Sequence, residues 1–268
     1  MKKGFLFVIA LYFIALCFSP AAFASRENQN LPDFDEFKSQ YEEFLQKLNI
    51  NKEGFEGLSL EEIQEIALTD PEPKYRYLAL LRLEVLNVDD SIEVIGQVLM
   101  RDPFPFIRSH AARIISESGN HEGQTFLIAA LKADPCLEVR DFAVYGLRFI
   151  GNESAQFPLI EALQRDPELK VQQRAAESLG MIGNYDAEET LSNVLLHATD
   201  LILRKVAALA LKWIHERYPL SDVGINALFT VYRRDDVEDI RKVVRRVLHE
   251  MGENVPNPDP EKPEPISF

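Results

Sequence analysis

The sequence predicts an all-α fold, a right-handed α-solenoid of stacked helix pairs, and three observations lead to this prediction. Arg76, Arg108 and Arg140 are equally spaced along the chain, and Arg204 follows two such intervals later. Alanine, leucine and turn-forming residues recur in the same phase, and the alternation of apolar and polar residues that marks strands is missing. A repeat of this length is typical of helical units that bury their apolar faces only against their neighbours.

Residues 1–24 are predicted to be a secretory signal peptide. Met1 to Lys3 is basic, Phe5 to Phe18 is apolar, and Ala22 to Ala24 supplies a cleavage site with small residues at both ends. An uncleaved signal anchor is the alternative, although the apolar run is short for a membrane span. Lipidation of Cys17 is not expected, because the bulky Leu16 stands where a lipidation site requires a small residue.

Composition restricts the ligands of the mature chain. Its formal charge changes from −14 to −16, because Lys2 and Lys3 leave with the signal peptide. A surface with this much negative charge repels nucleic acid and anionic membranes. We therefore expect neither to be a partner once the signal peptide is removed. Cys136 then has no intrachain partner, so disulfides cannot hold the fold together. The expected location is a bacterial periplasm or the medium.

Residues 25–69 are predicted to form N-terminal capping helices. Apolar residues step by three and four between Asp33 and Asn49, which indicates an amphipathic helix that covers the first repeat or binds a partner in a groove. The run from Ser59 to Glu62 has capping-box spacing, so a second helix should begin there and end near Leu68.

The repeats proper span residues 70–254. Each unit has a first helix introduced by Asp-Pro and ended by Gly or Asn in a left-handed conformation, followed by a shorter second helix. Five extra residues are predicted between Glu216 and Asp222, and the proline-rich acidic tail at 255–268 should be extended or disordered. The columns of the first helices are Ala79, Ala111, Ala143, Ala175 and Ala207; Leu83, Ile115, Leu147, Leu179 and Leu211; and Asn87, Gly119, Gly151 and Gly183.

One unit, with Asp134-Pro135, Val139-Arg140, Ala143, Leu147 and Gly151, resembles the short HEAT repeats also called PBS-lyase HEAT-like repeats. The resemblance implies an armadillo-type solenoid. Members of that family are mostly protein-binding scaffolds, and one branch attaches or isomerises bilin chromophores. The resemblance also implies a structural ladder of aspartates and arginines between units, weakened where Gln172 replaces arginine. The ladder would comprise Asp102, Asp134 and Asp166 with Arg108, Arg140 and Arg204.

No catalytic motif is found in the sequence. The five histidines fall in different units, and the motifs of zinc hydrolases, nucleophilic serines and phosphate-binding loops are missing. The sequence therefore predicts no catalytic residue, no metal site, no cofactor and no enzyme activity.

Two groups of residues are candidate contacts for a partner. Phe104 and Phe106 occupy an inter-repeat turn where other units have mostly polar residues, and they either pack locally or form an exposed anchor. The second group is a stripe on the second helices, which we expect to line the concave face; an ordinary solvated face is the alternative. This stripe contains Gln97, Met100, Arg101, Lys132, Gln164, Arg165, His197, Arg233 and Arg234.

The sequence thus predicts an exported, non-enzymatic scaffold that binds a protein or peptide on its concave face and inter-repeat turns. Apolar contacts would supply affinity, and arginines would recognise carboxylates of the partner. The alternatives are an enzyme similar to the bilin lyases and a purely structural spacer. The oligomeric state is not predicted.

Overall fold

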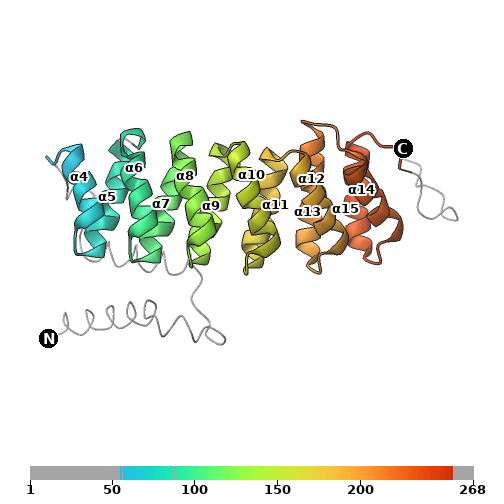
Figure 1. Ribbon diagram of the computed structural model, residues 1–268, viewed down its shortest axis with the longest axis horizontal. Helices are drawn as coiled ribbons and strands as arrows, with labels where there is room; N and C mark the ends of the chain where they lie inside the picture. Colours follow the sequence, from blue (N-terminus) through green and yellow to red (C-terminus); the bar gives the residue numbers. More distant parts are fainter. Residues whose placement is uncertain (1–54, 56, 87, 256–268) are drawn as a thin grey trace, which may run out of the picture. The chain divides into compact units, whose positions relative to one another are not determined.

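The computed structural model describes residues 55, 57–86 and 88–255 (Figure 1). The chain divides into two units, residues 1–57 and 58–268, and every described helix belongs to the second. The predicted signal peptide, the helix expected at 33–49, Asn87 and the tail beyond 255 lie outside the described residues. Within the described part, no helix is both long and apolar enough to cross a membrane.

The described helices follow one another in chain order as stacked pairs, as Figure 1 shows from α4 to α15. The first helices of the units are α5 (Pro73–Leu86), α7 (Pro105–Ser118), α9 (Leu137–Ile150), α11 (Leu169–Ile182), α13 (Leu201–His215) and α15 (Glu238–Glu250). The second helices are α4 (Leu60–Thr69), α6 (Ile92–Arg101), α8 (Gln124–Ala133), α10 (Glu153–Arg165), α12 (Tyr185–His197) and α14 (Asp222–Arg234). This arrangement confirms the predicted all-α solenoid.

The helix ends agree with the predicted signals in part. Ser59 and Glu62 form the expected capping box at the start of α4. Gly119 is left-handed at φ 71°, but Gly151 and Gly183 have φ of −70° and −72°, so the prediction of a left-handed residue is wrong there. At those two positions an added Cβ would collide with the carbonyl oxygen four residues earlier, which makes close approach the reason for glycine.

The core consists of the predicted columns. All five alanines of the first-helix column, from Ala79 to Ala207, have no exposed surface, and neither do the apolar residues of the next column, from Leu83 to Leu211. A residue without a side chain beyond Cβ lets neighbouring helices approach closely, while leucine and isoleucine fill the space between the two layers. The sequence repeat is therefore a packing repeat.

The two layers of helices differ in how closely they pack. In the middle of the stack α7, α9, α11 and α13 contact one another more extensively than α8, α10 and α12 do. The small residues of the first helices account for this closer packing. The prediction that the second helices line the concave face stays a prediction.

A ladder of buried ion pairs connects successive first helices. Arg76 Nε and Nη2 donate to the carboxylate of Asp102 at 2.7 and 3.1 Å, and Arg140 binds Asp166 in the same way at 2.7 and 3.0 Å. The remaining nitrogen, Nη1, donates to backbone carbonyls within the arginine's own unit. The hydrogen bond with Asp166 raises the pKa of Arg140. The other rungs are Arg108 with Asp134 and Arg204 with Asp235.

The ladder is interrupted at the unit where the sequence carries Gln172. Both members of the expected pair are replaced, since Ala198 occupies the position in the aspartate column one repeat after Asp166. Gln172 Nε2 still donates to the backbone carbonyl of Asp166 at 2.7 Å, as the arginines do within their own units. The predicted weakening is thus a complete loss of the ion pair at one junction.

A second set of hydrogen bonds joins the opposite ends of the helix pairs. Gln156 Nε2 donates to Asn184 Oδ1 at 2.8 Å, and Asn184 N–H donates back to Gln156 Oε1 at 3.1 Å. In the next unit Glu188 takes the place of the glutamine, and its carboxylate accepts hydrogen bonds from Ser221 and from the Gly224 N–H. These bonds hold the connection between α13 and α14, where the predicted insertion lies.

Candidate functional site

The predicted stripe lies at exposed or half-buried positions on the second helices. Lys132 and Arg165 come together at a cavity of about 410 Å³ between the ends of α8 and α10. Arg165 lies 3.8 Å from Glu161 on its own helix, and Gln97 is hydrogen-bonded to Glu93. The remaining members are distributed one or two to a helix: Met100 and Arg101 on α6, Gln164 on α10, His197 on α12, and Arg233 and Arg234 on α14.

The aromatic turn packs against the preceding unit. Phe106 is 7% exposed, and its ring centroid lies 5.0 Å from that of Tyr77 on α5. The guanidinium of Arg76 lies 5.6 Å from the ring centroid of the half-buried Phe104. The hypothesis that Phe106 is an exposed anchor is therefore wrong, because stacking of the units buries its ring between helices.

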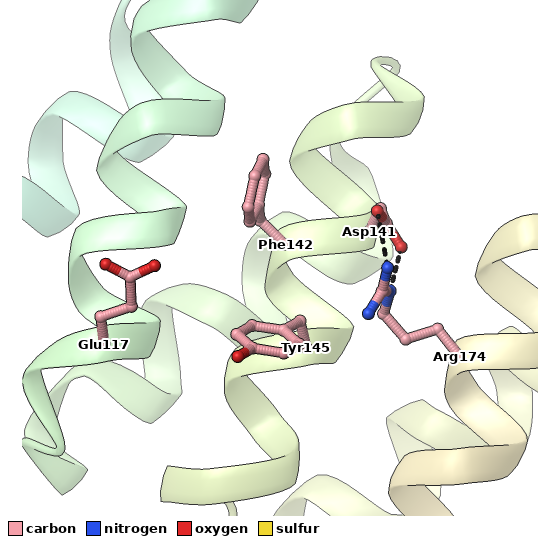
Figure 2. Close-up of a pocket in the computed structure, with 5 residues that line it drawn as sticks. All are labelled: Glu117, Asp141, Phe142, Tyr145 and Arg174. Carbon is pink, nitrogen blue, oxygen red and sulfur yellow. Dashed lines mark hydrogen bonds and ion pairs between the residues drawn. The ribbon is translucent and has the colours of Figure 1, made fainter. Parts of the chain in front are cut away.

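The first helices carry a different surface, which we call the α9 face and define by Phe142, Tyr145 and Phe149. Glu117 of α7, Asp141 of α9 and Arg174 of α11 flank it. Figure 2 shows the Tyr145 ring extending from α9 toward Glu117, with Phe142 one turn away and the Asp141–Arg174 pair on the opposite side. Phe142, Tyr145 and the three flanking residues line a cavity of about 260 Å³.

Sequence reasoning missed the α9 face, although a signal for it exists. The three aromatic residues are three and four positions apart, so they lie on one side of the helix. Their counterparts in the neighbouring units are His110, Arg113 and Glu117 on α7, and Arg174, Glu177 and Met181 on α11. An aromatic set within otherwise mostly polar columns distinguishes this unit, as Phe104 distinguished the turn.

Charges around the α9 face are paired and fixed. Arg174 Nε donates to Asp141 Oδ1, and Lys170 Nζ lies 3.2 Å from Asp141 Oδ2. The Arg174 guanidinium also lies 5.5 Å from the Tyr145 ring centroid. Asp141 is buried and bound by two cations, and it holds Arg174 in place beside the Tyr145 ring.

A partly exposed apolar row extends from the α9 face across the first helices. Phe149, Met181 and Trp213 follow one another at the repeat interval on α9, α11 and α13. Phe149 is 53% exposed, and the Arg148 guanidinium lies 5.5 Å from its ring centroid. Trp213 packs close to the backbone of α11, since a Cβ on Gly180 would lie 2.7 Å from Trp213 Cε3. Because Gly180 has no side chain, the Trp213 ring can lie directly against α11.

The α9 face is aromatic in character. Within the described ranges, no group of three or more His, Cys, Asp or Glu side chains could hold a metal ion. Burial and the neighbouring Glu138 together raise the pKa of Cys136 to about 12, so the thiol is protonated at neutral pH. What the α9 face does present is rigid aromatic area beside a small cavity.

Comparison with known proteins identifies the repeat. A family model described as HEAT repeats matches residues 60–148 and 155–249. No curated protein matches the chain in sequence. The complex of CpcE and CpcF of phycocyanin lyase from Nostoc sp. is a similar solved structure, with 21% identity, a TM-score of 0.47 and coverage of 73% of this chain and 77% of that one. Human deoxyhypusine hydroxylase in complex with glycerol is another, with 15% identity, a TM-score of 0.36 and coverage of 78% and 99%.

These comparisons correct the prediction that the protein is not an enzyme. Both similar structures are of enzymes, at 21% and 15% identity, so the prediction, which rested on missing sequence motifs, no longer stands. At such identities the likeness extends to the fold alone, and enzyme status is open. The family match covers more than half of the chain and agrees with the ladder and the packing columns. The protein therefore belongs to the HEAT-repeat family.

Proposed function

We propose that this protein is an exported scaffold that binds an extended segment of a partner protein, or a peptide, across the α9 face. One observation carries the proposal: Phe142, Tyr145 and Phe149 form an aromatic line on a single helix beside a cavity of about 260 Å³. Single exposed aromatic residues are common, but a line that continues into Met181 and Trp213 is typical of an interaction surface.

The packing of the α9 face favours binding at low entropic cost. Arg174 and Arg148 lie against the rings of Tyr145 and Phe149, and Asp141 and Glu177 fix these arginines in turn. Side chains that are already held in place lose little rotamer freedom when a ligand covers them. Burial of aromatic surface then appears as affinity, because each ring removes a large apolar area from water.

The surface also specifies the chemistry of its ligand. The arginines of the α9 face already bind carboxylates, so an acidic partner gains little from them. The Tyr145 hydroxyl has no hydrogen-bond partner among the described residues, and its end of the ring points toward Glu117 (Figure 2). A segment with an apolar anchor and a neighbouring backbone amide or carbonyl fits this arrangement. Lys132 and Arg165, in the other layer, are the proposed secondary contacts for carboxylates.

Selection of ligands from a random peptide library tests the proposal. Peptides that bind the wild-type protein should share an apolar anchor, and the Tyr145→Ala/Phe149→Ala variant should bind them at least tenfold more weakly, because two aromatic contacts are lost. Phe157→Ala is the matched control, since Phe157 is 75% exposed on the second helix α10. Equal affinity of the wild type and the double variant would contradict binding at the α9 face.

Export is part of the proposal and needs its own measurement. The mass of the chain recovered from the periplasm or medium of an expressing bacterium should correspond to cleavage after Ala24. Recovery of the full-length chain in the cytosol would contradict export. Incubation of the purified protein with a bilin addresses the lyase alternative, because a stable visible absorbance band would assign it a chromophore-handling activity in place of the scaffold role.

A further inference from the structure

The second helix α8 ends differently from the other second helices that follow α4. Its last residue is Ala133, whereas each of the others that the structure describes ends in a basic residue. These basic residues are Arg101 of α6, Arg165 of α10, His197 of α12 and Arg234 of α14. A base at this position is favoured by the carbonyl end of the helix dipole. Because alanine stops at Cβ, α8 leaves open the space that a long side chain would fill.

A cavity of about 410 Å³ lies at this place, and we call it the α8–α10 cavity. Its volume falls within the range of small-molecule sites, about 300–1,000 Å³. Part of its wall is apolar, because the buried side chains of Leu131, Pro158 and Ala162 line it. Pro158 has no N–H, so it offers a ligand no hydrogen-bond donor. This part of the wall therefore suits an apolar group.

The rim of the α8–α10 cavity has an excess of positive charge. The two aspartates that line it, Asp134 and Asp166, are each neutralised by an arginine of the ladder through two hydrogen bonds. Lys132 has no hydrogen-bond or ion-pair partner in the part of the chain that the structure describes. Arg165 lies 3.8 Å from Glu161, farther than a hydrogen bond, and both side chains are mostly exposed. Lys132 and Arg165 can therefore bind an anion without giving up a strong partner.

We propose that the α8–α10 cavity is a binding site for an apolar carboxylate. The carboxylate lies between Lys132 and Arg165, and the apolar body of the ligand covers Leu131, Pro158 and Ala162. The cavity belongs to the second-helix layer, so this ligand is distinct from the segment proposed for the α9 face. Two sources supply such chemistry, a small organic acid and the C-terminal residue of a peptide.

A ligand with one negative charge fits this site better than a ligand with two. Glu161 beside Arg165 keeps the positive excess of the rim small. The last turns of α8 and α10 line the cavity, and the carbonyl end of a helix repels anions. A phosphate dianion meets more of this repulsion than a carboxylate does. The geometry therefore favours a carboxylate that gains part of its affinity from apolar contact.

Titration of the purified protein with phenylpropionate, followed by nuclear magnetic resonance of the backbone amides, tests the proposal. We expect saturable shifts at the amides of α8 and α10. Phenylpropanol lacks the charge and acetate lacks the apolar body, so each should bind roughly tenfold more weakly than phenylpropionate.

Three variants assign the binding to the α8–α10 cavity. Lys132→Gln/Arg165→Gln removes both cations and should weaken phenylpropionate binding roughly tenfold. Ala133→Leu should also weaken it, because Ala133 lines the cavity, and the exposed position tolerates the larger side chain. Arg101→Gln is the matched control, since Arg101 ends α6 at the equivalent position, and its affinity should stay within about twofold of the wild type. The same spectra show that each variant is folded.

Two peptides that end in phenylalanine, one with a free C-terminal carboxylate and one amidated, distinguish the sources. Binding of the free-carboxylate peptide at α8 and α10 would assign the site to chain ends, and binding of phenylpropionate alone would assign it to small acids. Three results would overturn the proposal: no saturable shift at α8 and α10, equal affinity for phenylpropionate and phenylpropanol, or unchanged affinity in Lys132→Gln/Arg165→Gln. Because none of these measurements involves the α9 face, they leave binding there untouched.

Discussion

Two junctions of the solenoid, only one repeat apart, are held together in different ways. Arg140 and Asp166 form a bidentate buried ion pair, whereas the following junction has Gln172 and Ala198 at the equivalent positions. The two replacements occur together. A buried ion pair contributes little more than a neutral pair of similar volume, but half of one leaves an uncompensated charge. The rung is therefore retained or lost as a unit.

Other contacts take over at the junction without a rung. Gln173 Nε2 donates to Asp200 Oδ1 at 3.1 Å, and Arg204 Nε turns to the backbone carbonyl of Leu195 at 2.8 Å. The absence of a side chain on Gly180 lets Trp213 and the backbone of Ala210 approach α11 closely. Shape complementarity replaces charge at this junction.

Asp166→Ala should have the largest effect, because it leaves the guanidinium of Arg140 buried without its carboxylate. We expect the free energy of unfolding, from urea titration, to fall by about 3–5 kcal/mol. The double variant Arg140→Gln/Asp166→Ala reproduces the natural pair at the next junction and should recover at least half of the loss. A double variant that is less stable than Asp166→Ala would contradict the view that the rung is lost as a unit.

Gly180→Ala should have the next largest effect, at the junction that depends on close packing. The added Cβ would lie 2.7 Å from Trp213 Cε3 and 2.8 Å from Ala210 Cα, so α11 and α13 must separate. A destabilisation of about 1–3 kcal/mol is expected from such overpacking, again measured by urea unfolding. If the variant were as stable as the wild type, close approach would not be what replaces the ion pair.

Ala198→Asp tests the same junction in the opposite direction. A carboxylate without an arginine partner should destabilise the protein by about 1 kcal/mol, because Ala198 is only half-buried and water can still reach the new group. Adding Gln172→Arg should restore the wild-type free energy of unfolding by completing a rung. A thermal melt of the three proteins compares them directly, and failure of Gln172→Arg to rescue would show that the junction no longer has room for a rung.

The smallest effect is expected at acid pH, at the rung between Arg204 and Asp235. Burial alone would raise the pKa of Asp235, but hydrogen bonds from Arg204 and the Val237 N–H outweigh it and lower the pKa below its ordinary value. The rung therefore stabilises the fold above pH ~4, and this contribution is lost as pH falls through the lowered pKa. Solvent partly screens the pair, so the expected effect is small. Between pH 4 and 2, the free energy of unfolding should fall further in the wild type than in Asp235→Asn, by less than about 1 kcal/mol.

The control for this acid experiment is Asp236→Asn, which removes the same charge from an exposed neighbour. Its unfolding free energy should follow that of the wild type across the whole pH range. If the free energy of unfolding fell equally in the wild type and in Asp235→Asn between pH 4 and 2, the rung would not titrate in this window.

The fold was predictable because its information is local and repeated. Each unit shows its own alanine, leucine and arginine positions, and agreement in phase across units indicated stacking before any contact was known. Gln172 even marked the unit at which the ladder would fail. The sequence also has Ala198 in place of an aspartate at the position that would have completed the rung. The importance of Ala198 follows only from the structure, in which the other aspartates bind arginine through two hydrogen bonds.

The candidate site was less predictable because exposure depends on neighbours. Phe106 and Phe149 are both aromatic residues at positions that are polar in some other units, yet one is 7% and the other 53% exposed. Phe106 packs against Tyr77 across a junction, whereas Phe149 packs against Tyr145 on its own helix and keeps about half of its surface in solvent. The stripe of the second helices was expected to share a face; two of its members, Lys132 and Arg165, line one cavity, and the shared face stays a prediction.

By itself, the sequence determined the repeat, the helix pairs and the core columns, because these recur at a constant interval along the chain. The structure decided which aspartate binds which arginine, and it added Arg76 and Asp235 to the ladder. Only the tertiary structure decided which layer packs more closely, which aromatic rings are buried and where charges are neutralised. The physical reason is that these properties arise between side chains a full repeat apart in the chain, and they depend on the separation of two helices that neither helix encodes alone.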